Sequence, residues 1–97
     1  MAYQIVWSSQ AIEDIDAIAI YIARDSPSYA AAIVRKLIDE IRQLKNHPMM
    51  GKTVFEFEEP SIKEVWTYSY RVIYQVHEET ITIATVVHGK ALLSLEG

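Results

Sequence analysis

The sequence predicts an α+β fold in which an N-terminal strand precedes an antiparallel helical hairpin, and an antiparallel β-meander then packs on the helices. Three observations lead to this prediction. A short run rich in β-formers opens the chain, two amphipathic segments follow with a very short connection between them, and four strand-like runs with brief links come last. At 97 residues the chain has the length of one domain, so we expect residues 1–97 to form a single unit.

The first strand is expected at residues 3–7, where YQIVW alternates weakly in polarity. Ser8 or Ser9 offers the N-cap of the first helix, which runs to about Arg24 and carries acidic residues near its start, where the helix dipole favours anions. One face of this helix is apolar and consists of Ala11, Ile15, Ile18, Ala19 and Ile22.

The second helix is expected to follow a second N-cap, Ser26, with Pro27 at its first position, where the missing N–H costs nothing. It should run for about five turns and end before Pro48. Its apolar residues recur at spacings of four and three: Ala30, Val34, Leu37, Ile41 and Leu44.

The strand-like runs after the helices are TVFEFEE, SIKEVWTY, YRVIYQVH and TITIATVVH. Alternation in the third run places Arg71 on the solvated face of the sheet and turns Tyr70, Val72, Tyr74 and Val76 toward the helices. In the last run the residues expected to be buried are Ile81, Ile83, Thr85 and Val87. Alternation does not predict which face of the second run is buried, because Ile62, Glu64, Trp66 and Tyr68 share one face.

Composition narrows the function classes. A net charge of −4 and a pI near 5.2 disfavour direct binding of nucleic acid through phosphate neutralisation, so a protein partner is the natural expectation. There is no cysteine, no metal-ligand spacing of histidines and no phosphate-binding loop, and we expect neither a metal nor a cofactor. No run approaches the ~18 apolar residues of a membrane span and no signal peptide is evident, so we expect a cytoplasmic protein.

Four short motifs follow one another along the chain: Leu44, Pro48, Gly51 and Lys52; Ile62, Lys63 and Glu64; Tyr70, Arg71 and Tyr74; and His88, Gly89 and Lys90. This ordered set resembles the RelE/ParE superfamily of bacterial toxins, and most closely its ParE-like branch. No single motif is specific, but the set covers nearly the whole chain in the family's order.

The resemblance implies the toxin of a type II toxin–antitoxin module, neutralised by a small antitoxin. ParE-like members bind DNA gyrase and are not enzymes, whereas RelE-like members are ribosome-dependent mRNA endoribonucleases. After Gly89 this chain lacks the second arginine and the tyrosine that the nuclease branch carries, which favours the gyrase-directed function. The nuclease and a non-toxic module that only binds an antitoxin stay as alternatives.

Two surfaces are predicted for the partners. A basic cluster of Lys63, Arg71, His88 and Lys90 on the open face of the sheet would contact the target. An apolar groove along the helices would take the antitoxin, giving a dimer or a toxin–antitoxin hetero-oligomer, and its residues would be Ile15, Ile22, Val34, Leu37 and Ile41.

The alternative interpretation of Arg71 is structural. Its guanidinium would pair with Glu64 or Glu56 across neighbouring strands, an interaction of under ~1 kcal/mol if exposed. The EFEE run that contains Glu56 would then be a solvated edge.

Overall fold

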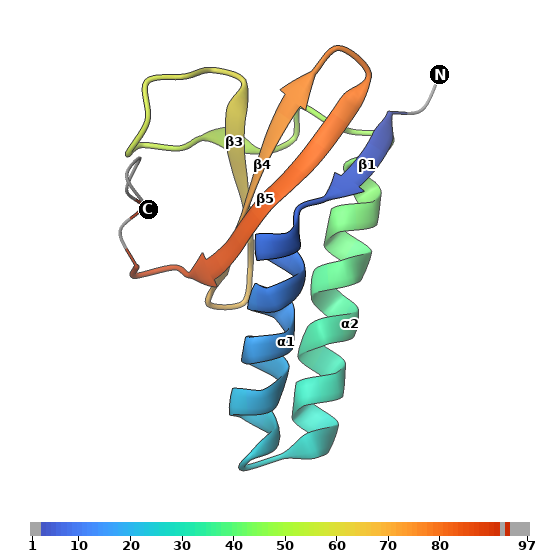
Figure 1. The fold of residues 1–97 in the computed structure, drawn as a ribbon, viewed down its shortest axis with the longest axis vertical. Helices are drawn as coiled ribbons and strands as arrows, with labels where there is room; N and C mark the ends of the chain where they lie inside the picture. The colour runs from blue at the N-terminus through green and yellow to red at the C-terminus, as the bar shows by residue number, and fades with distance from the viewer. Residues whose placement is uncertain (1–2, 92, 94–97) are drawn as a thin grey trace.

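The computed structural model of the protein describes residues 3–91 and 93 and consists of a helical hairpin packed on one face of a five-stranded sheet (Figure 1). The helices are α1 (Ser9–Ala23) and α2 (Pro27–Gln43). The strands are β1 (Gln4–Trp7), β2 (Lys52–Thr53), β3 (Ile62–Thr67), β4 (Tyr70–His77) and β5 (Thr80–His88). The predicted order of an N-terminal strand, a helical hairpin and a β-meander is confirmed.

The order of strands across the sheet is β1-β5-β4-β3-β2. Strand β1 pairs in parallel with β5, and the other neighbours are antiparallel. The prediction of a strand over TVFEFEE is wrong: only Lys52–Thr53 pairs with β3, and residues 54–61 form a loop. In a strand Val54 and Glu56 would point to the same face. Here Val54 is buried in the core, whereas Glu56 bonds to Arg71 on the outer face of the sheet.

Both helices begin at the predicted caps. The Ser8 hydroxyl accepts a hydrogen bond from the Ala11 N–H (3.0 Å), and the Ser26 hydroxyl accepts one from the Tyr29 N–H (3.1 Å). The tip of the hairpin, where the two helices join, projects beyond the sheet in Figure 1. The sheet therefore covers only part of the apolar surface of the helices. Among the described residues, neither helix is long and apolar enough to cross a membrane.

The core lies between the helical hairpin and the inner face of the sheet. It is built from Leu37, Ile41, Leu44, Val72, Tyr74, Ile81 and Ile83, all nearly or fully buried. The Tyr74 hydroxyl donates to the Pro48 carbonyl (2.9 Å) and accepts from the Gly51 N–H (3.0 Å), and burial raises the pKa of this phenol. A side chain at Gly51 would meet the Glu64 carbonyl at 2.7 Å, so the connection from α2 to β2 is held tightly against β3 and β4.

A β-bulge changes which residues of β5 are buried. Ile73 pairs with Thr85 but Tyr74 pairs with Ile83, so β5 has one extra residue at this point. The extra residue reverses the alternation, and the core takes up Val86 in place of Val87. The prediction is confirmed for Ile81 and Ile83 and wrong for Val87, which pairs with Arg71 on the outer face. Thr85 is half-buried, with its hydroxyl bonded to Asp14 of α1.

Candidate functional site

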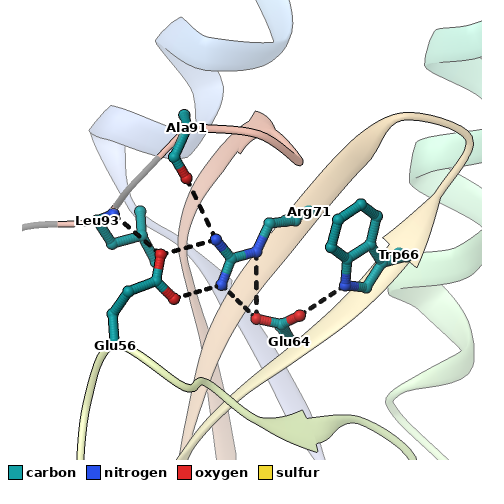
Figure 2. Close-up of polar contacts among 6 residues, drawn as sticks. All are labelled: Glu56, Glu64, Trp66, Arg71, Ala91 and Leu93. Atoms are coloured by element: carbon teal, nitrogen blue, oxygen red, sulfur yellow. Dashed lines mark hydrogen bonds and ion pairs between the residues drawn. The ribbon is translucent and has the colours of Figure 1, made fainter.

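The outer face of the sheet, turned away from the helices, has Arg71 at its centre. Arg71 pairs with Trp66 of β3 and Val87 of β5, and its side chain is only 1% exposed. The expectation that Arg71 lies on an open, solvated surface is therefore wrong. What buries it is a set of contacts from a neighbouring strand, from the loop of residues 54–61 and from the chain after β5, all drawn in Figure 2.

The first partner of Arg71 is Glu64 on the adjacent strand β3. Glu64 Oε1 accepts hydrogen bonds from Nε (3.1 Å) and from Nη2 of the guanidinium. Its other oxygen, Oε2, accepts from the indole N–H of Trp66 (2.5 Å). Glu64 and Trp66 are two residues apart in one strand and so share a face. The Glu64 carboxylate is therefore held between the side chains of Arg71 and Trp66.

The second partner is Glu56 in the loop of residues 54–61. Its two oxygens accept from Nη2 (2.8 Å) and Nη1 (2.9 Å) of Arg71, which is the bidentate geometry that arginine makes with carboxylates. Oε2 also accepts from the backbone N–H of Leu93 (3.0 Å). The hydrogen bonds from Arg71 lower the pKa of Glu56 to about 2, and the bond to Glu56 is the main reason that the pKa of Arg71 is raised.

Two aromatic rings complete the surroundings of the guanidinium. The Arg71 Cζ atom lies 5.4 Å from the ring centre of Phe55 and 5.9 Å from that of Trp66. Both rings are largely exposed on their other sides, at 75% and 52%. We call Arg71, Glu56, Glu64, Phe55 and Trp66 the arginine cluster. With two carboxylates on one guanidinium, the cluster carries a net charge of −1.

The basic cluster predicted from the sequence does not form. Lys63 pairs with Tyr74 and His88 pairs with Tyr70, so both lie on the helix side of the sheet, opposite to Arg71. The rings of His88 and Tyr70 are in edge-to-face contact at 5.9 Å. Lys90 is exposed after the end of β5. Any role of these residues in binding a target stays a prediction.

The structural interpretation of Arg71 is confirmed in a stronger form, because the guanidinium pairs with both glutamates. The small value expected for an exposed pair does not apply here, since Glu56 and Glu64 side chains are each 8% exposed. Removing one member of a buried ion pair leaves an uncompensated charge. Sequence alternation could not reveal this burial, because the covering residues come from a loop and from the segment after β5.

The predicted antitoxin residues separate into three groups. Leu37 and Ile41 face the sheet and are buried in the core, so the prediction that they line an open groove is wrong. Ile15 and Ile22 are half-buried and pack against the core. Val34 lines a groove of about 640 Å³ that runs between α1 and α2. Ile15 and Ile41 border two smaller pockets, of about 320 and 480 Å³.

This interhelical groove is formed mainly by residues that the sequence interpretation overlooked. Its apolar lining includes Ala19, Ala23, Ala30, Ala31, Val34 and Ile38, and Arg35, Asp39 and Arg42 border it. The available signal was the number of alanines in both helices, since small side chains leave space between helix backbones. Among the described residues no group of three or more His, Asp or Glu side chains is placed to hold a metal ion.

Residues 5–93 match the family model of the ParE toxin of the type II toxin–antitoxin system parDE. The chain belongs to the ParE toxin family. The resemblance to the RelE/ParE superfamily is thereby confirmed, and this ParE family member is a toxin of the type II toxin–antitoxin class. A search of the curated proteins found no match.

Solved structures share the fold of this ParE family member. The chromosomal ParDE system from P. aeruginosa aligns with a TM-score of 0.73 at 19% identity, covering 90% of this chain and 96% of that one. A double mutant of the E. coli toxin RelE in the free state aligns with a TM-score of 0.68 at 16% identity, covering 93% of this chain and 86% of that one. The heterotetrameric YoeB–YefM complex from Staphylococcus aureus aligns at 0.57 and 16% identity, covering 91% and 98%. Identities this low establish a common fold alone.

Proposed function

We propose that this toxin inhibits DNA gyrase by binding to it, without being an enzyme. The observation that carries this choice is the burial of Arg71 between Glu56 and Glu64. Cleavage of RNA at a 2′-hydroxyl needs a cation that can stabilise the charge of the phosphorane. A guanidinium that is 1% exposed and bonded to two carboxylates is not available to a phosphate.

The charge of the arginine cluster supports the same choice. Its net charge of −1 repels the phosphates of an RNA strand that approaches the outer face. Two more carboxylates, of Glu58 and Glu59, are exposed in the adjoining loop. The match to the ParE family model supports the gyrase-directed branch independently, because the ParE-like branch acts through protein binding.

We also propose that a cognate antitoxin binds the interhelical groove. The groove is apolar and lined largely by alanines, whose side chains are small. A partner helix or large apolar side chains can therefore approach the α1 and α2 backbones closely. Arg35 and Arg42 at its border favour an antitoxin segment with acidic residues beside its apolar ones. ParDE and YoeB–YefM are solved as toxin–antitoxin systems, which supports a hetero-oligomer as the resting form.

The test of the activity compares two reactions with the purified chain. DNA supercoiling by gyrase should be inhibited, while mRNA on translating ribosomes should stay intact. Cleavage of mRNA at defined codon positions, with supercoiling unaffected, would establish the endoribonuclease instead. If neither reaction responds but an antitoxin still binds, the chain is a non-toxic antitoxin-binding module.

The test of the antitoxin site uses two neighbouring alanines of α2. Ala31 and Ala32 are both exposed, but only Ala31 lines the groove. Ala31→Glu should therefore abolish binding of the cognate antitoxin, whereas Ala32→Glu should leave it intact. Both variants should still inhibit supercoiling. Equal effects of the two substitutions on antitoxin binding would place the antitoxin elsewhere.

A further inference from the structure

Two large aromatic side chains are exposed on the outer face of the sheet, beside Arg71. Phe55 is 75% exposed and Trp66 is 52% exposed, and neither belongs to the core. Their ring centres lie 5.4 and 5.9 Å from the same guanidinium carbon, so the two rings form one aromatic patch. Packing of the fold does not account for this exposure, and exposed apolar patches of this kind are typical of interaction surfaces.

Trp66 is held in one orientation by its neighbours. Its indole N–H donates to Glu64 Oε2 (2.5 Å), as Figure 2 shows. One edge of the ring lies against Gly89, where a Cβ would overlap indole atoms. The ring is therefore ordered before a partner arrives, which lowers the entropic cost of using it in an interface.

Phe55 is fixed through the residues before and after it. Val54 is fully buried in the core, and Glu56 makes the bidentate contact with Arg71. The backbone around Phe55 is thus anchored on both sides, once to the core and once to the outer face. The loop presents the ring to solvent at a defined place.

The charge around the aromatic patch is negative. Within the described part of the chain, the outer face of β2, β3 and β4 and the loop of residues 54–61 carry two cationic side chains and four carboxylates. The cations are Lys52 and Arg71, and the carboxylates are Glu56, Glu58, Glu59 and Glu64. Lys52 belongs to this face because it pairs with Glu64. Aromatic ring faces and carboxylates both attract cations, so this surface suits a partner with exposed Arg or Lys side chains.

We propose that the aromatic patch docks a basic segment of the target protein, with an Arg or Lys side chain of that segment stacked on the rings of Phe55 and Trp66. The inference rests on the proposed function, under which the target is gyrase, and adds the surface that makes the contact. Trp and Arg are the residue types most enriched among those that dominate binding energy at interfaces. The target surface has the opposite sign to the one expected from a basic cluster, because Arg71 is neutralised by its two glutamates.

Binding of the full chain to immobilised gyrase, measured by surface plasmon resonance, tests the inference. Phe55→Ala and Trp66→Ala should each weaken the affinity about tenfold, as is usual when an interface loses a central aromatic residue. Trp66→Phe keeps a ring at this position and should lose less affinity than Trp66→Ala. Tyr21→Ala is the matched control and should bind as the native chain does, because Tyr21 is 69% exposed but lies on α1, in the other layer.

A charge reversal tests the sign of the partner surface. Glu58→Lys and Glu13→Lys change the net charge equally, but Glu58 follows Phe55 in the same loop, whereas Glu13 is exposed on α1. Glu58→Lys should slow association with gyrase about tenfold at low salt, and Glu13→Lys should slow it much less. The difference should disappear at high salt, where charges are screened.

The outcomes separate this inference from the proposed function. If the native chain inhibits supercoiling but Phe55→Ala and Trp66→Ala bind gyrase with native affinity, or the Glu58 and Glu13 reversals act equally, the inference is wrong and the proposed function stands. A native chain that binds no gyrase would overturn both. Urea midpoints establish that each variant is folded, and Phe55→Ala carries the test alone if Trp66→Ala unfolds, since most of the Phe55 surface is exposed.

Discussion

Asp14 of α1 holds the β-bulge of β5 through the backbone N–H of Val86, which donates to Oδ2 at 2.9 Å. The same oxygen accepts a hydrogen bond from the Thr85 hydroxyl. One carboxylate thus joins the first helix to the point at which the last strand changes its buried face. The Ser8 hydroxyl adds a bond to the Ala84 carbonyl (2.8 Å), so the start of α1 is attached to the bulge at two places.

Asp14→Ala should lower the free energy of unfolding by about 1–3 kcal/mol, because the Val86 N–H and the Thr85 hydroxyl lose a partly buried acceptor. Urea denaturation measures the change. Asp16→Ala is the matched control, since Asp16 lies on the same helix and is exposed. Similar losses in the two variants would mean that Asp14 acts only through the charge of the helix.

Arg71→Ala should lower the free energy of unfolding by about 3–5 kcal/mol, since it leaves Glu56 and Glu64 without their counter-ion. Thermal and urea unfolding provide the measurement, with the exposed Arg35→Ala as the control. A loss of stability no larger than that of Arg35→Ala would show that the arginine cluster is dispensable for the fold.

The stability of the chain should fall in acid through Glu56. Its pKa is about 2 in the folded protein against an ordinary value of 4.5, so the contribution is present above pH 4.5 and is lost as the pH falls toward 2. A shift of this size corresponds to about 3 kcal/mol. Unfolding of Glu56→Gln across this range should lack that part of the pH dependence. Parallel pH profiles of the two proteins would exclude Glu56 as its source.

Glu78→Gly should stabilise the protein by about 0.5–1 kcal/mol, because Glu78 has a φ of 54° in the turn between β4 and β5, where glycine carries no steric penalty. Its contact with His77 at 3.9 Å is exposed and contributes little. Glu79→Gly in the same turn should give no gain, as Glu79 has no positive φ. A gain from Glu79→Gly equal to that from Glu78→Gly would contradict the explanation.

The fold could be predicted from the sequence because its signals are local. Ser8, Ser26 and Pro27 mark the helix starts by hydrogen bonding to the next turn, and Leu37, Ile41 and Leu44 follow a helical period. Alternation also placed Val72 and Tyr74 in the core. It failed at β5 because a bulge shifts the period by one residue, and nothing in TITIATVVH marks the extra residue.

The site was harder to predict because its partners are distant in sequence. Glu56 and Glu64 were recognised as candidates for Arg71, but the burial of all three depends on a loop and on the segment after β5, which carry no periodic pattern. A sheet face with an arginine and few large apolar residues predicts exposure, as was expected here. Lys63 and His88 were predicted to lie on the same face of the sheet as Arg71, but they lie on the opposite face. Strand pairing decides which side chains share a face, and the sequence did not reveal that pairing.

The parallel pairing of β1 with β5 has a consequence for synthesis of the toxin. Ile5 pairs with Ile81 and Trp7 with Ile83, so the first strand finds its partner only after residues 80–83 have left the ribosome. Contacts between such distant residues form late, because a long loop must close before they are made. An unfinished chain, or one released before β5, lacks the neighbour of its own N-terminal strand. Termination before residue 80 therefore yields a fragment in which β1 has no strand beside it.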